Sequence, residues 1–489
     1  MRKFSLIPGL FVALAAFAPA TQAQQVKHII LFVGDGMDLQ SEMATSRYLF
    51  GKDQALSFHK LPYKGNVSTW DVSTYDHWAK ALGKPPYEPS AIHPAVGFDP
   101  LKGGLLPSPL QKSGIDREYV AKAATDSASA ASAWATGRKT VGGNISWLPG
   151  DAPGGELETI AEILRREKGF AIGVASTVPF THATPAAHVS HNVYRNNYHQ
   201  IAEEIVLKTQ PEVVIGGGDG SATYMSPVAL EYLSSNGASP YVFVRRQAGV
   251  DGAAALRKAA GEAAARRKKL FGLFGEPAKG NFESPVPQDQ PGKPRVEPPT
   301  AENPLLKDAV AAALDVLKTN PRGFFAMFEQ GDIDWAAHDH DFHRIIGATW
   351  GLHQAVKAAV EYVDRPGDDI TWGNTLVMVT ADHGNSYLRV EKPLKMGDLP
   401  EQAGASYPGG EVHFGSKGHT NELVRLYARG AGLDRIRKYE GAWYPCTTII
   451  DNTQLFHIML EAAGASRPSP LKVVPDNAAC AAGQAGGAR

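Results

Sequence analysis

Cysteine is scarce in this sequence, with only Cys446 and Cys480 among 489 residues. Two thiolates are too few to build a cysteine-based zinc site, so a metal held by this chain would need histidine and carboxylate ligands. The two sulfurs could form one disulfide that fastens the C-terminal tail, or they could stay as free thiols. The sequence leaves both possibilities open.

An excess of charge of either sign is also missing. The 49 basic and 50 acidic residues give a formal net charge of −1, which excludes a bulk attraction to nucleic acid or to an anionic membrane surface. With 43% apolar and 20% charged residues, the composition is that of an ordinary soluble globular protein. The length suffices for one large α/β domain with insertions or for two domains.

Long apolar runs are absent apart from one at the N-terminus, residues 4–18. Two basic residues precede this run, and small residues ending at Ala23 follow it, which predicts a signal peptide over residues 1–23. An uncleaved anchor is the alternative, but a proline and a glycine interrupt the run and it is short for a membrane span. We therefore expect a periplasmic or secreted protein without a membrane anchor.

Short, almost continuously apolar segments recur along the chain and predict strands that are buried on both faces of a sheet. They cover residues 26–33, 170–175, 213–215, 324–328 and 375–379. Helix-like segments alternate with them, over residues 128–136, 156–166, 197–208, 306–319 and 345–363. This alternation predicts an α/β fold, a central mostly parallel sheet with helices on both faces, and a site at the carboxyl ends of the strands.

Two segments interrupt this alternation. Residues 84–111 are rich in proline and glycine, and residues 253–304 combine an Ala/Arg/Lys helix with a stretch dense in proline, glycine and charge. We expect a single catalytic domain over residues 24–489, in which both segments are insertions that extend away from the core. Each could form a lid, an interface or a loosely ordered loop.

Polar side chains gather where the predicted strands end. They are Asp35 within Gly-Asp-Gly-Met, the segment from Glu329 to His338, Asp382 and His383 within Thr-Ala-Asp-His-Gly, and His419 ahead of a late strand at 423–427. Asp334 and His338 are four residues apart, so a helical turn would bring both to one face. Each motif alone is weak evidence, but together they predict a metal site at one edge of the sheet.

Ser127 opens a run of small residues that predicts a helix from 128 to 136. Such a helix can begin close to a substrate, with its N-terminal amides and its dipole directed at an anion. A helix that merely packs tightly against the sheet would have the same composition, so this motif alone decides nothing.

Together these motifs resemble those of alkaline phosphatases. Gly-Asp-Gly-Met, Asp-Ser with its small-residue helix, Ala-Thr-Pro-Ala-Ala at 183–187, the 329–338 segment, Thr-Ala-Asp-His and His-Thr occur in the order typical of that family. The resemblance extends from about Val26 to about Leu460. It implies an alkaline phosphatase-like fold and a phosphoric monoester hydrolase that acts on small phosphate monoesters, with a homodimer as one possible assembly.

The resemblance also implies a role for each residue of the site. One Zn²⁺ would be held by Asp334, His338 and His419. A second Zn²⁺ would be held by Asp35, Asp382 and His383. One Mg²⁺ would be held by Asp35, Thr184 and Glu329. The nucleophile that forms a phosphoserine would be Ser127, and Arg195 would grip two phosphate oxygens with its planar fork.

Four residues depart from the pattern of the family, and two of them, Gln330 and Asp332, change the surroundings of the ligands while the ligand spacing is kept. His182 stands where enteric members carry Asp and animal members carry His, so we expect a third site that is weaker for magnesium or more permissive, unless His182 only packs. Trp335 stands where relatives have Lys or His. We expect the loss of a water-mediated phosphate contact there, which would loosen the product phosphate.

Three other functions remain as alternatives. A sulfatase on the same scaffold would need Cys or Ser in a Cys/Ser-x-Pro-x-Arg setting, and that setting is absent around Ser127. A phosphodiesterase would share the metal ligands, although Arg195 and the third-site residues favour monoesters. A non-catalytic phosphate- or metal-binding protein of the envelope would not need a nucleophile.

Overall fold

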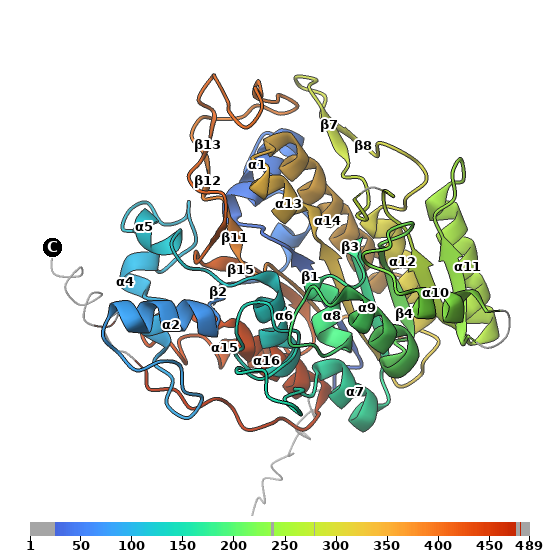
Figure 1. Ribbon diagram of the computed structural model, residues 1–489. Coiled ribbons are helices and arrows are strands. Elements are labelled where there is room, and N and C mark those ends of the chain that lie inside the picture. The colour runs from blue at the N-terminus through green and yellow to red at the C-terminus, as the bar shows by residue number, and fades with distance from the viewer. Residues whose placement is uncertain (1–24, 236–238, 278, 476–479, 481–489) are drawn as a thin grey trace, which may run out of the picture.

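The computed structural model describes residues 25–235, 239–277, 279–475 and 480, and the predicted signal peptide lies outside them. A ten-stranded sheet crosses the molecule in the order β16-β2-β15-β10-β1-β9-β3-β4-β6-β5 (Figure 1). β15 (Val424–Gly430) is antiparallel to β10 and β2, and the other pairings in this sheet are parallel. The mostly parallel sheet that the sequence predicts is therefore confirmed.

The five predicted strands form the middle of this sheet. They are β1 (His28–Gly34), β3 (Ala171–Pro179), β4 (Val213–Gly217), β9 (Phe324–Gln330) and β10 (Thr375–Thr380). Every residue of these strands is buried, as expected for strands covered on both faces. Four further strands lie toward the edges: β2 (Tyr63–Ser68), β5 (Tyr241–Arg245), β6 (Lys269–Leu273) and β16 (Ile449–Asp451).

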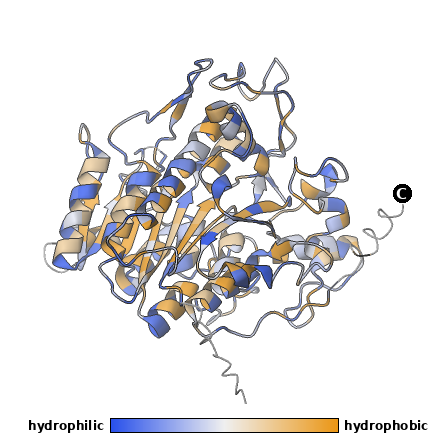
Figure 2. Cartoon of the chain, turned by 180° about the vertical axis from the view of Figure 1, so that it is seen from behind, coloured by the Kyte–Doolittle hydropathy of each residue, from blue (hydrophilic) through white to orange (hydrophobic). Residues whose placement is uncertain are grey.

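Helices cover both faces of the sheet. One layer consists of α1 (Leu39–Phe50), α11 (Gly252–Arg266), α12 (Leu306–Leu317) and α14 (Phe342–Val363). The other consists of α6 (Ser127–Thr136), α7 (Ile160–Lys168), α8 (Ala183–Val189) and α16 (Asn452–Ala463). Figure 2 shows the hydrophobic strands enclosed between these helices. The burial of this apolar surface is the main force that holds the layers together.

The five predicted helices are all present, but their ends differ from the predicted ranges: by one to three residues in α6, α12 and α14, and by more in the other two. α7 begins at Ile160 rather than 156, because Thr159 caps it and exchanges hydrogen bonds with Glu162 in a capping box. The helix predicted over 197–208 is α9 (Tyr198–Glu203), continued by one stretch of π-helix, Glu204–Thr209.

The prediction that all of 253–304 leaves the core was wrong in its first part. α11 packs against α12, and β6 pairs with both β4 and β5 inside the main sheet. The buried face of this helix, which includes Leu256, Ala260 and Ala263, is difficult to recognise in the sequence because it consists mostly of alanine. After β6 the chain still buries Phe274 and Phe282 in the main core. It departs from the core beyond them, as a hairpin of β7 (Val286–Gln288) and β8 (Arg295–Glu297) that rises above the body (Figure 1).

The 84–111 segment packs on a small second core rather than on the main one. Ile92, Val96 and Phe98 from this segment contact a cluster that also contains Trp70 and Tyr444. Two short helices lie within it: α3 (Pro94–Gly97), beside α2 (Val72–Ala81), and α4 (Pro100–Gly103), beside α5 (Arg117–Val120).

Cys446 and Cys480 form a disulfide, which decides between the two possibilities that the sequence left open. Across the described residues, we find no helix with the length and apolarity that a membrane crossing requires.

Candidate active site

The predicted site residues converge at the carboxyl edge of the sheet. β10, β1 and β9 are neighbours in register, with Val33 opposite Thr380 and Gly34 opposite Gln330. The residues that follow or end these strands are therefore brought side by side. Sites in open α/β sheets lie at the carboxyl ends of the strands, and the loops that follow β1, β9 and β10 all lie there.

One group of ligand-type side chains consists of Asp334, His338 and His419, whose candidate ligand atoms all lie within 4.8 Å of one another. Asp334 and His338 lie on the short helix α13 (Asp332–His338), as their spacing predicts. The Nε2 atoms of the two histidines are 3.1 Å apart, and each is 3.4 Å from an Asp334 carboxylate oxygen. Asn385 donates a hydrogen bond to Asp334 Oδ1 at 2.5 Å.

Backbone carbonyls fix the orientation of these two histidines. His338 Nδ1 lies 2.8 Å from the carbonyl oxygen of Lys417, and His419 Nδ1 lies 2.8 Å from that of Thr125. A carbonyl oxygen only accepts, so each Nδ1 must carry a proton, and in a neutral ring Nε2 is left with its lone pair. Two lone pairs that face each other at this distance beside a carboxylate suit a shared cation.

The second group consists of Asp35, Asp382 and His383, again with ligand atoms within 4.8 Å of one another. All three side chains are buried. Asp382 Oδ1 accepts hydrogen bonds from the backbone N–H groups of Gly36 and His383, both at 2.9 Å. Its other oxygen lies 3.0 Å from His383 Nε2, and the nearest Asp35 oxygen lies 3.6 Å from the same nitrogen.

Ser127 lies against the second group, at the first residue of α6. Asp126 caps this helix by accepting from the N–H of Ser129 at 3.0 Å. Ser127 Oγ is 3.3 Å from His383 Nε2, and the His383 ring stacks on His419 with 3.5 Å between centroids. The hydroxyl therefore faces both groups, and the N-terminal amides of a ten-residue helix lie behind it.

Arg195 reaches the same place through an ion pair with the cap residue Asp126, Nη1 to Oδ2 at 2.9 Å. Although burial opposes it, the Arg195 guanidinium lowers the pKa of the Asp126 carboxyl, with help from hydrogen bonds donated by Ser129. The backbone N–H of Gly143 also donates to Asp126. Asp126 therefore fixes both the start of α6 and the direction of the Arg195 guanidinium.

Thr184 and Glu329 are buried beside these groups, Thr184 on α8 and Glu329 near the end of β9. The Ser176 hydroxyl donates to Glu329 Oε2. Burial raises the pKa of Glu329 to about 7. Thr184 Oγ1 and Glu329 Oε1 have no hydrogen-bond partner among the described residues. These two buried oxygens suit a hard cation that prefers oxygen ligands.

The carboxylates of the site repel one another. Burial raises the pKa of Asp35 well above its usual range, and the charges of Asp382, Asp334 and Glu329 raise it further. Asp35 Oδ1 and Asp382 Oδ2 have no hydrogen-bond partner in the described part of the chain. Such a concentration of buried carboxylates is unstable unless cations balance it.

His182 and Trp335 belong to an aromatic cluster. The His182 ring stacks on Tyr198 with 5.7 Å between centroids and 9° between planes, and it also contacts Tyr224 and Trp335. Burial, followed by the charge of Arg195, lowers the pKa of His182 to about 3. The packing interpretation therefore has direct support, while the expected effect on the third metal site stays a prediction.

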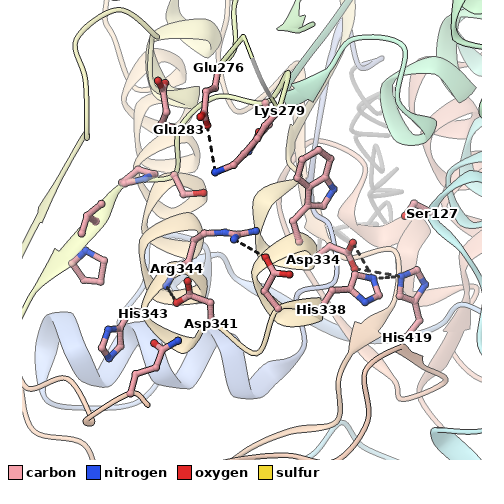
Figure 3. A pocket seen from close by; sticks show the side chains of 18 of the residues that line it. Ser127, Glu276, Lys279, Glu283, Asp334, His338, Asp341, His343, Arg344 and His419 are labelled. Carbon is pink, nitrogen blue, oxygen red and sulfur yellow. Dashed lines mark hydrogen bonds and ion pairs between the residues drawn. The ribbon is translucent and has the colours of Figure 1, made fainter. Parts of the chain in front are cut away.

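A cavity of about 840 Å³ opens onto Ser127, Arg195, Asp334, His338 and His419. Figure 3 shows Ser127 and the Asp334 group at one end of it, and Glu276, Glu283, Lys279, Arg344, Asp341 and His343 toward the other. Trp335 also lines it. The cavity is far larger than one phosphate group needs, so it also has room for the remainder of an organic substrate.

Residues 112–395 match the model of the family described as alkaline phosphatase, which is more than half of the chain. The chain belongs to the alkaline phosphatase family. It is thus an enzyme of the phosphoric monoester hydrolase class, and the predicted family is confirmed.

Individual relatives agree with this assignment. Alkaline phosphatase 4 of Bacillus subtilis is 32% identical over 53% of this chain and 49% of its own length. A streptomycin-6-phosphate phosphatase of Streptomyces griseus is 27% identical over 93% of this chain and 96% of its own. Among solved structures, a mutant of the alkaline phosphatase from the Antarctic bacterium TAB5, with Mg bound in the M3 site, matches with a TM-score of 0.58. It is 19% identical and the match covers 91% of this chain and all of that one, which shows a shared fold.

Reasoning from the sequence did not assign a role to several residues that hold the site together. They are Asp126, Asn385 and Ser176. Asp126 carried a signal, because Asp directly before a predicted helix is a preferred cap. Asn385 and Ser176 carried none, because their partners are distant in sequence.

Proposed function

We propose that this alkaline phosphatase hydrolyses phosphate monoesters through a phosphoserine on Ser127, with two zinc ions and one magnesium ion. The observation that carries the proposal is the position of Ser127 Oγ, 3.3 Å from His383 Nε2 and at the mouth of a helix N-terminus. A protein that only binds phosphate would not need a hydroxyl there.

The residues present fit these metals. Histidine nitrogens with carboxylate oxygens suit zinc, in the groups Asp334–His338–His419 and Asp35–Asp382–His383. The buried oxygens of Thr184, Glu329 and Asp35 suit magnesium, the metal that the TAB5 neighbour holds in its M3 site. Bound there, the ions would supply Lewis-acid stabilisation of the attacking and leaving oxygens and of the negative charge between them.

The side chains of the protein then have distinct roles. Ser127 Oγ loses its proton to solvent and attacks phosphorus in line with the leaving group. The P–O bond to serine forms while the P–O bond to the leaving alkoxide breaks, and the alkoxide takes up a proton from water. Arg195 is oriented by Asp126 and can donate two parallel N–H groups to the equatorial phosphoryl oxygens. Water then attacks the phosphoserine, phosphate leaves, and the serine hydroxyl is restored.

A Ser127→Ala variant provides the first test. We expect it to lose hydrolysis of p-nitrophenyl phosphate while it keeps its metal content, measured by elemental analysis of the purified protein. Thr136→Ala, at the far end of the same helix, is the matched control and should retain activity. Full hydrolysis by Ser127→Ala would contradict the phosphoserine mechanism.

The comparison of p-nitrophenyl phosphate with bis-p-nitrophenyl phosphate separates monoesterase from diesterase activity. We expect the monoester to have the higher kcat/KM, because Arg195 and the buried third-site oxygens serve a phosphoryl group with three free oxygens. Faster turnover of the diester would refute the assignment. We also propose that the enzyme is exported, as the N-terminal segment of its sequence predicts.

A further inference from the structure

The far part of the active-site cavity carries more negative than positive charge. Away from Ser127 and Arg195, its lining includes four carboxylates and two cations. The carboxylates are those of Glu276, Glu283, Asp339 and Asp341, and the cations are Lys279 and Arg344. These groups come from the segment that precedes β7, from the loop between α13 and α14, and, for Arg344, from the first turn of α14 (Figure 3).

The two cations are already paired. Arg344 Nη1 lies 2.9 Å from Asp339 Oδ2, and Lys279 Nζ lies 3.5 Å from Glu276 Oε2. Each pair is therefore close to neutral as a unit. This leaves Glu283 and Asp341 as the carboxylates whose charge decides the sign of the cavity.

Glu283 shares its cationic partner with a second carboxylate. Arg246 Nη2 lies 3.5 Å from Glu283 but 2.8 Å from Glu302, so one guanidinium serves two carboxylates. These side chains are largely buried, with 17% of Glu283 and 16% of Arg246 exposed, so their charges are poorly screened by solvent. The cluster keeps one uncompensated negative charge at the wall of the cavity.

Asp341 is the other unbalanced carboxylate. Its Oδ1 accepts from the backbone N–H of Arg344 at 3.0 Å and so caps α14. No Lys, Arg or His side chain of the described residues forms an ion pair with it. A second negative charge therefore faces the cavity, opposite the phosphoryl end.

We infer that this cavity selects phosphate monoesters whose alcohol carries a positively charged nitrogen. The inference rests on the proposed function, because the phosphoryl group must lie at Ser127 for the alcohol to extend toward Glu283 and Asp341. Complementary charge favours a cation there and repels a second anion. Trp335 also lines the cavity, and an indole ring attracts ammonium groups.

Phosphocholine and 3,3-dimethylbutyl phosphate provide a direct test, because they have the same shape and differ by one permanent positive charge. We expect a kcat/KM for phosphocholine about fivefold or more above that of the neutral ester, which corresponds to about 1 kcal/mol. 3-Phosphoglycerate, with an added carboxylate, should be the poorest of the three. The preference should decrease in 1 M salt, where the screening length is about 3 Å.

The double variant Glu283→Gln/Asp341→Asn removes both charges while its amides can still accept from Asn303 and cap α14. Its preference for phosphocholine should decrease to about one, with the hydrolysis of p-nitrophenyl phosphate retained. Glu262→Gln, on the exposed side of α11, changes the net charge elsewhere and should leave the preference intact.

Equal kcat/KM values for the cationic and neutral esters would overturn the inference, and so would an unchanged preference in the double variant. If the enzyme still hydrolyses p-nitrophenyl phosphate in these cases, the proposed function stands. If the wild-type enzyme hydrolyses none of these esters, including p-nitrophenyl phosphate, the proposed function fails and the inference fails with it.

Discussion

A largely buried histidine, His191, should make the free energy of unfolding of this enzyme decrease as the pH rises into the alkaline range. His191 is held between two carboxylates, with Nδ1 3.0 Å from Glu204 and Nε2 3.4 Å from Glu162, and 9% of its side chain is exposed. Burial opposes its charge, but hydrogen bonds to Glu162 and Glu204 raise its pKa to about 10. A charged imidazole thus joins α7, which includes Glu162, to the π-helical segment that begins at Glu204.

The sign of the pH effect follows from this shift. The unfolded chain has a histidine pKa of about 6.5, so the folded state holds its proton more tightly. The stabilisation is complete below about pH 6.5, decreases as the pH rises, and is lost near pH 10. Each pKa unit corresponds to about 1.4 kcal/mol. Because Glu162 is 40% exposed, solvent screening reduces the total, and we expect about 2 to 3 kcal/mol.

The assay is chemical unfolding of the wild type and of His191→Gln at pH 7, 8.5 and 10, at fixed metal concentration. The difference in the free energy of unfolding should be about 2 to 3 kcal/mol at pH 7 and close to zero at pH 10. His199→Gln is a matched control, because His199 is exposed and bonds only a backbone carbonyl. A difference between wild type and His191→Gln that stays constant with pH would refute the reasoning.

Three further predictions concern the site. Trp335→Lys should restore a phosphate contact, which would strengthen inhibition by phosphate and slow turnover; if both stay unchanged, Trp335 does not affect product release. Asp126→Asn should misdirect Arg195 and lower kcat/KM by about tenfold to a hundredfold in steady-state assays, and an unchanged value would show that Arg195 orients itself. Removal of metals by chelation should abolish activity and lower the melting temperature, and zinc with magnesium should restore both; activity that survives complete chelation would contradict a metal site.

The sheet and its polar loops were predictable because two simple signals coincide in them. A buried parallel strand is almost entirely apolar, and the polar residues that follow it must turn at the sheet edge. For this reason the sequence predicts that Asp35 and Asp382 lie close together. The spacing of Asp334 and His338 likewise predicts that both lie on one face of a helix, and both are found on α13.

Other features depend on contacts that no local pattern encodes. α11 looked like decoration because alanine gives a weak apolar stripe, yet Leu256 and Ala263 on it are buried in the main core. His182 meets Tyr198 and Tyr224 only because α8, α9 and a later loop fold together. Which carboxylates of the cavity lack a cation is decided by tertiary packing, so the sequence could not reveal it.

The hydrogen bond from His419 to the Thr125 carbonyl has a mechanical consequence. Thr125 stands two residues before Ser127, so the segment that leads into the Ser127 helix also orients the His419 imidazole. A displacement of this segment would move the hydroxyl and turn the imidazole in the same motion. The positions of the Ser127 hydroxyl and of the His419 ring are therefore linked through one short piece of backbone, residues 125–127.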